Sequence, residues 1–78
     1  SYNIIMNLSA KIENDKLIMF NLVNGARTKV ITLPAGATYS GPIVSGDNVT
    51  VSIHYKNGNN RSRTYNIKSG LLTSDILM

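Results

Sequence analysis

The sequence predicts an all-β protein: a small antiparallel β-sandwich of six or seven short strands, with a small β-barrel as the alternative. Two observations lead to this class. Apolar and polar residues alternate with period two, most clearly over residues 49–55, which is typical of a strand with one buried and one exposed face. Turn-forming residues, chiefly Gly and Asn, recur between such segments at short and regular spacing.

The length and composition indicate one domain that covers residues 1–78 and has few means of stabilisation. A chain of this size buries only about 60% of the surface that its unfolded form exposes. Small domains usually add disulfides, a metal or a partner subunit, but this chain has no Cys, one His and four acidic residues. No cofactor is expected, and association with another chain is the support that remains.

The first half predicts three strands joined by tight turns. Residues 2–12 alternate, and residues 13–16 form a polar turn. Residues 17–23 are apolar on both faces, and matching their Ile18 side to the first strand predicts that Ile12 pairs with Ile18. Asn24-Gly25 is a hairpin signal, and the third strand follows over residues 28–33.

The second half predicts a short edge strand, a hairpin and a last segment. Gly41-Pro42 places residues 39–44 at an edge or a bulge, because Pro has no N–H for a ladder. Residues 49–56 and 61–68 form the hairpin, on either side of the loop of residues 57–60. Residues 71–78 end in three apolar residues, although Ser74-Asp75 could instead cap one helical turn.

The hairpin register follows from keeping Tyr65 and Ile67 on the same face as Val49, Val51 and Ile53. That condition requires residues of like parity to pair and a loop of three or five residues, with Gly58 or a following Asn in the left-handed region. The expected pairs are Ile53 with Tyr65, Val51 with Ile67, His54 with Thr64, and Tyr55 with Arg63.

The sequence predicts that the protein is not an enzyme. His54 is the single imidazole, and its nearest acid, Asp47, stands at the other end of the same strand. A catalytic triad or a transition-metal site needs His beside an oriented acid or further ligands. The Gly residues are scattered through turns, and none lies in the strand–Gly–helix context of a phosphate loop. Catalytic, cofactor and metal residues are therefore expected to be absent.

Two surfaces suggest binding roles. The net charge of +4 comes mostly from the second half, where Lys56, Arg61 and Arg63 stand near Tyr55, a combination that nucleic-acid surfaces use. The exposed face of the hairpin offers a row of hydroxyl, amide and cationic groups that could bind a glycan as a lectin does. Its members are Thr50, Ser52, His54, Thr64, Asn66 and Lys68.

The leading hypothesis is a binding or assembly module that associates with itself or with another protein. Residues 17–23 and the apolar end exceed what one small sandwich can hide. The candidate oligomer contacts are Ile5, Leu17, Met19, Val23, Ile76, Leu77 and Met78. No segment has the composition of a signal peptide or a membrane span, so we expect a soluble protein, with the cytoplasm favoured and the localisation otherwise open.

Overall fold

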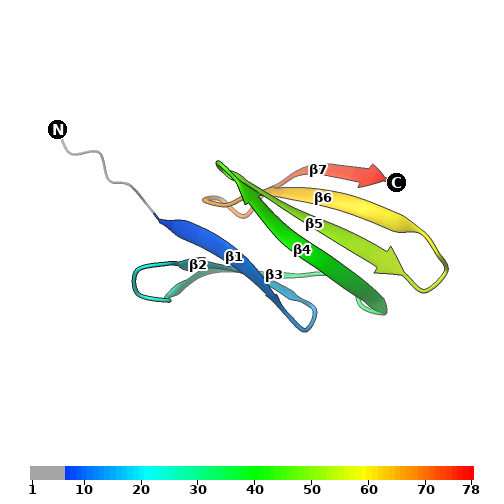
Figure 1. The fold of residues 1–78 in the computed structure, drawn as a ribbon, viewed down its shortest axis with the longest axis horizontal. Helices are drawn as coiled ribbons and strands as arrows, with labels where there is room; N and C mark the ends of the chain where they lie inside the picture. The colour runs from blue at the N-terminus through cyan, green and yellow to red at the C-terminus, as the bar shows by residue number, and fades with distance from the viewer. Residues whose placement is uncertain (1–6) are drawn as a thin grey trace.

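The structure is a computed structural model that describes residues 7–78, and it confirms the all-β prediction. Seven antiparallel strands form two sheets that pack face to face as a small β-sandwich (Figure 1). The strands are β1 (Leu8–Glu13), β2 (Lys16–Asn21), β3 (Arg27–Thr32), β4 (Ala37–Ser45), β5 (Asn48–Tyr55), β6 (Asn60–Asn66) and β7 (Leu72–Leu77). Residues 7–78 form no helix, so none in this part is long and apolar enough to cross a membrane.

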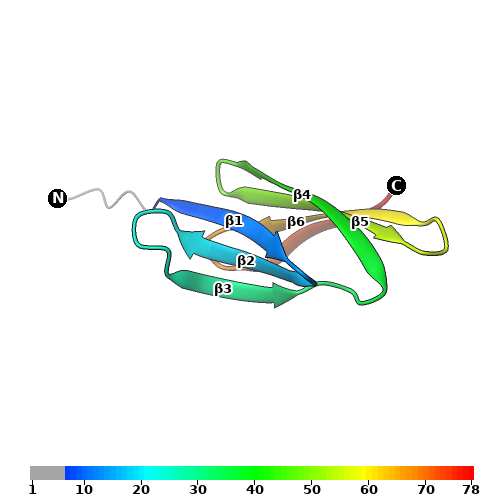
Figure 2. The same cartoon turned by 60° about the horizontal axis from the view of Figure 1, so that its bottom comes forward.

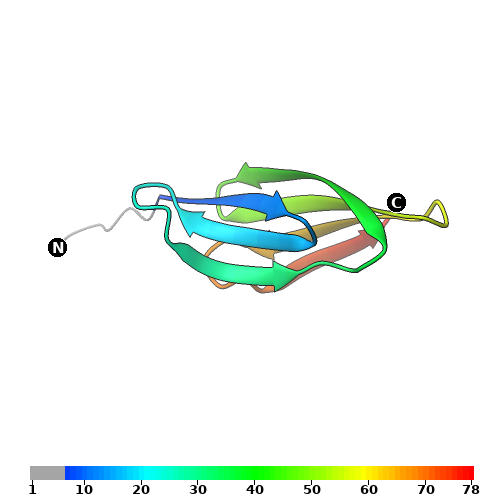
Figure 3. The ribbon, with the colours of Figure 1, turned by 90° about the horizontal axis from the view of Figure 1, so that it is seen from below.

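The strand order is the order of the chain: β1-β2-β3 in one sheet and β4-β5-β6-β7 in the other. Figure 2 shows the three-stranded sheet below the four-stranded one, with residues 33–36 crossing between them. Seen from below, β3 and β7 lie at the same long side of the sandwich (Figure 3). Because β7 is the last strand in the order β4-β5-β6-β7, one of its edges has no partner strand within the described residues.

The predicted pairing of Ile12 with Ile18 was wrong. Ile12 pairs with Leu17 and Lys11 with Ile18, because β1 and β2 are joined by two residues, Asn14 and Asp15. Asn14 adopts a φ of 54°, which Asn tolerates better than most residues. The apolar pattern could not decide this register, since β2 is apolar on both faces and either face could have faced the core.

The β5–β6 hairpin keeps the predicted face but not the predicted pairs. Val49 pairs with Tyr65, Val51 with Arg63 and Ile53 with Arg61, so residues of like parity do face each other. The Tyr55 N–H donates to the Asn59 carbonyl at 2.9 Å, which leaves a loop of residues 56–58. Gly58 has a φ of 91° there. The tight turn lies closer to β5 than expected, which shifts every predicted pair by four residues.

The core lies between the two sheets and is built mainly on β2, β5 and β6. Its buried side chains come from alternate positions: Leu17, Met19, Leu33, Val49, Val51, Ile53, Tyr65 and Ile67. Each of the three β5 members is 0% exposed. Thus β5 is the central strand of the fold, and its inward face holds the core together.

A bulge in β4 requires glycine at position 41. The β4–β5 register shifts between Ser40 and Ile43, and Gly41 adopts a φ of 99°. A Cβ at this position would lie 3.2 Å from the Thr50 carbonyl oxygen and 3.3 Å from the Ile43 nitrogen. A side chain here would therefore require the backbone of Thr50 or Ile43 to shift, in addition to the strain of the positive φ.

Gly41→Ala is therefore expected to destabilise the fold more than Gly36→Ala. Gly36 also has a positive φ, 71°, but a Cβ there would meet nothing within 4 Å. Gly36→Ala, the control, should lower the free energy of unfolding by about 1–2 kcal/mol, because of its backbone conformation alone. Gly41→Ala should lower it further, because the new Cβ also crowds the backbone of Thr50 and Ile43. Urea unfolding of both variants measures the difference, and equal midpoints would show that β4 and β5 separate freely at the bulge.

Candidate functional site

The outer face of the four-stranded sheet is mostly polar, although Ile43 and Ile76 also lie on it. We call it the polar face; its hydroxyl, amide and imidazole members are Thr38, Ser40, Thr50, Ser52, His54, Asn60, Ser62, Thr64 and Ser74. It contains four of the six residues predicted as a ligand surface. The other two lie at its end: the Asn66 Oδ1 accepts the backbone N–H of Lys68, and Lys68 forms a 3.7 Å ion pair with Asp47.

Side chains of the polar face bond to one another across β5 and β6. The hydrogen-bonded pairs of this ladder lie at the inward-facing positions, as the Tyr55–Asn59 bond shows. The outward pairs are therefore the other type, in which antiparallel strands bring side chains closest. The Thr50 and Thr64 hydroxyls accordingly lie 3.0 Å apart. Thr50 and Thr64 thus bond to each other across the two strands.

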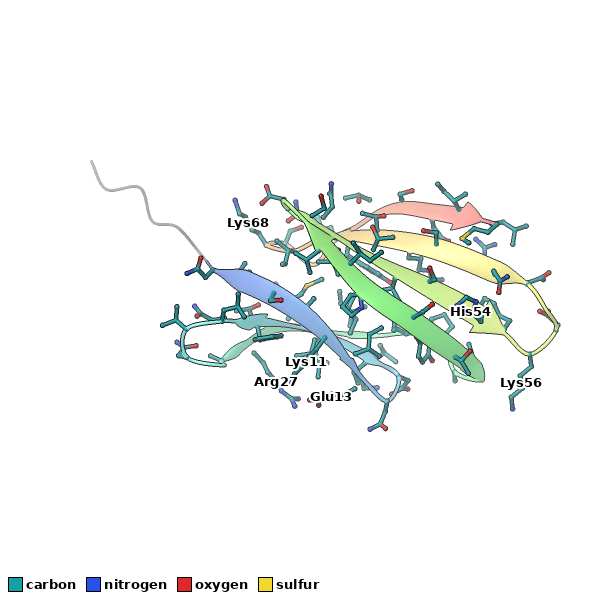
Figure 4. All side chains as sticks on the ribbon, in the orientation of Figure 1. Lys11, Glu13, Arg27, His54, Lys56 and Lys68 are labelled. Carbon is teal, nitrogen blue, oxygen red and sulfur yellow. The ribbon has the colours of Figure 1, made fainter. Side chains whose placement is uncertain are left out.

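His54 joins three strands of this face in one chain of hydrogen bonds. Its Nε2 lies 2.7 Å from the Ser40 Oγ on β4, and its Nδ1 lies 2.9 Å from the Asn60 Oδ1 on β6. Sequence reasoning missed both partners. Asn60 looked like part of the loop, and the bulge at Gly41 hid which residue of β4 stands beside His54. Figure 4 shows His54 on β5, in the four-stranded sheet.

The arginines of the predicted basic loop are engaged within the chain. Arg61 Nη1 lies 3.0 Å from Asp75 Oδ1, and Arg63 Nε lies 3.2 Å from Asp75 Oδ2. Partial burial acts to lower the pKa of Arg63, but its interaction with Tyr65 and the charge of Asp75 outweigh that effect and raise the pKa. Both arginines sit on the inward side, opposite Ile53 and Val51.

Arg63 does not face Tyr55, as the sequence predicted, because the register places it opposite Val51. Tyr55 is half-buried against the core. Lys56 stands exposed in the loop beyond β5 (Figure 4). The four residues of the predicted basic loop therefore do not form one surface: two arginines hold Asp75, a tyrosine packs, and a lysine extends from the loop.

Charged side chains cover part of the outer face of the three-stranded sheet. Glu13 binds Lys11 at 3.0 Å and Arg27 at 3.3 Å (Figure 4). Arg27 stands opposite Phe20 and Glu13 opposite Lys16, so their ion pair passes over Ile18 on the strand between them. Ile18 is 1% exposed. The hydrogen bond from Lys11 and its charge lower the pKa of the Glu13 carboxyl.

The predicted oligomer contacts fall into four groups. Leu17 and Met19 are 0% exposed in the core of their own chain, so they belong to no free surface. Val23 is 80% exposed, but it lies in the β2–β3 turn, away from the other candidates. Ile5 lies outside the described residues. The last three, Ile76, Leu77 and Met78, remain as exposed neighbours.

The last eight residues carry an apolar edge. Five of the ten exposed large apolar side chains belong to this segment: Leu71, Leu72, Ile76, Leu77 and Met78. The Met78 N–H donates to the Asn60 carbonyl at 2.8 Å, and alternation along an antiparallel strand then directs the N–H and C=O groups of Asp75 and Leu77 away from β6. We call the outward backbone of β7 with these five side chains the β7 edge.

Residues 7–78 contain no group of three His, Asp or Glu side chains placed to hold a metal ion, and their surface has no pocket. No protein-family model, curated protein or solved structure matches this chain. The β7 edge and the polar face are the two candidate functional surfaces of the described residues.

Proposed function

We propose that this protein is a non-enzymatic assembly module in which two copies join through their β7 edges. The observation that carries the proposal is a strand edge that has no partner strand within residues 7–78 and is flanked by exposed apolar side chains. Proteins usually protect such edges with charge, proline or a covering loop. Here two exposed apolar side chains stand at the C-terminal end of the strand: Ile76, 58% exposed, and Leu77, 60% exposed.

A second copy fits this edge because β7 can pair with itself about a two-fold axis. An axis at Asp75 would place two carboxylates directly opposite each other, which is unfavourable. An axis at Ser74 would run the pairing through residues 72–74, where the β6–β7 register shifts. An axis at Ile76 avoids both problems.

With the axis at Ile76, each Ile76 faces its copy, and Leu77 of one chain faces Asp75 of the other. Asp75 and Leu77 are the residues whose N–H and C=O point outward, so these pairs exchange hydrogen bonds in both directions. The two Ile76 side chains then meet in the closer type of pair. Two four-stranded sheets become one continuous sheet of both chains, as in strand addition to a sheet edge.

The wild-type protein is expected to have twice its 8.5 kDa chain mass in solution. A contact between two strand edges is small, below the roughly 1,200–2,000 Å² that stable interfaces bury, so the dimer should dissociate on dilution. Light scattering over a concentration series measures the mass, and a monomer at every concentration would contradict the proposal.

The salt dependence of binding distinguishes the two alternative functions, nucleic-acid binding and glycan binding. Nucleic-acid binding requires free cations and weakens steeply as salt rises, because bound counterions are released, whereas glycan binding on the polar face should hardly respond to salt. The ion pairs of Arg61 and Arg63 with Asp75 support assembly over nucleic-acid binding. The bond between the Thr50 and Thr64 hydroxyls leaves fewer free groups on the polar face for a glycan.

A further inference from the structure

Ser40, His54 and Asn60 are arranged as a nucleophile, a base and an orienting group. The Ser40 hydroxyl lies 2.7 Å from His54 Nε2, and His54 Nδ1 lies 2.9 Å from Asn60 Oδ1. An amide oxygen can only accept, so Nδ1 carries the imidazole proton and Nε2 keeps a free lone pair. That lone pair accepts the Ser40 hydroxyl proton. Serine nucleophiles are activated by an arrangement of this kind.

The sheet holds the three side chains in place. They come from three adjacent strands, β4, β5 and β6. His54 pairs directly with Asn60, at the type of position where cross-strand side chains lie closest. Ser40 stands one pair further along, opposite Ser52. Because strands of a sheet are more rigid than loops, the hydrogen-bonded geometry needs little ordering when an electrophile arrives.

We propose that Ser40 is a reactive nucleophile that is acylated by activated esters. In this step the Ser40 Oγ forms a bond to the carbonyl carbon, and the bond from that carbon to the leaving oxygen breaks. The Ser40 proton moves to His54 Nε2 and then to the departing aryloxide. The Ser52 hydroxyl, directly opposite in the register, is a donor available on the same face for the negative charge that develops on the carbonyl oxygen.

This inference goes beyond the proposed assembly function and does not depend on it. Ser40 lies on β4 and the β7 edge lies at the opposite side of the same sheet. The surface of residues 7–78 has no pocket to hold an ester. We therefore expect one acylation per chain, governed by the reactivity of the serine, and no saturation with ester concentration.

The experiment uses 4-nitrophenyl acetate, with release of nitrophenolate as the rate and peptide mass spectrometry as the location of the acetyl group. The expected label is on Ser40. A general base contributes about 10²–10⁴-fold to such steps, so His54→Gln should slow acetylation of Ser40 by about 10²-fold. Ser40→Ala should remove the label. Ser62→Ala, which removes a hydroxyl from the same face, is the matched control and should leave the rate unchanged.

Two variants at position 60 test the role of the orienting group. Asn60→Asp replaces the amide with a carboxylate that can only accept, so it fixes the same tautomer and should preserve the rate or raise it. Asn60→Ala removes the acceptor and should lower the rate. Far-UV circular dichroism of each variant reports whether the fold is intact. Acetylation spread over several hydroxyls, or a Ser40 rate unaffected by His54→Gln in a folded protein, would overturn the proposal.

Discussion

Ile76→Lys is expected to convert the dimer into a folded monomer. In the proposed pairing the two Ile76 side chains face each other across the two-fold axis, so the substitution removes both and sets two like charges in direct opposition. Each isoleucine loses roughly 1.5 kcal/mol or more of apolar burial. Together these losses should weaken the dimer by at least about 100-fold in Kd.

The fold of the single chain should survive, because Ile76 is 58% exposed in the monomer. The matched control is Ile43→Lys. Ile43 is 68% exposed, pairs with Thr50 and so lies on the outer side of the same sheet, on the opposite edge strand. Sedimentation of both variants distinguishes the outcomes. If Ile43→Lys dissociated the dimer as well, or if neither variant did, the interface would lie elsewhere.

Ile53→Ala is expected to remove a large part of the stability of the domain. Ile53 is 0% exposed on the inward face of β5, and truncating a buried isoleucine typically costs about 2–5 kcal/mol. A domain of this size has a total free energy of unfolding of only about 4–12 kcal/mol. We therefore expect a large fraction of the variant molecules to be unfolded near 37 °C.

Ile43→Ala is the control for this loss, since the same truncation at an exposed site usually changes stability by less than about 0.5 kcal/mol. Urea unfolding followed by tyrosine fluorescence gives both values. A loss below about 1 kcal/mol for Ile53→Ala would mean that β5 is not the central support of the core.

The sequence predicted the sandwich and the inward face of β5 and β6 because apolar residues occupy only one side of β5. Slipping that pairing by one residue would have set Ser62 opposite Ile53 and Thr64 opposite Val51, and so buried both polar side chains. No such penalty exists for β2, whose buried Leu17 and Ile18 point to opposite sides. There the two-residue turn at Asn14 decided the register, and the apolar pattern gave the wrong answer.

Prediction of the candidate site was also limited by strand register, which the apolar pattern does not determine. The alternation of β5 correctly assigned His54 to the polar side, but its partners depend on how far β4 and β6 slide along β5. A bulge at Gly41 and a turn at Gly58 set those offsets. Neither offset is visible in the alternation pattern. Likewise, the engagement of Arg61 and Arg63 by Asp75 required the pairing of β7 with β6.

The order of the strands has a consequence for how the chain folds. Each strand pairs with its immediate neighbour in the sequence, and no backbone hydrogen bond joins the two sheets in residues 7–78. Most contacts therefore close short loops, and the contact order is low for a β-sandwich, which favours rapid folding. We therefore expect each sheet to form as a separate meander before the two dock through side chains, across the connection at residues 33–36.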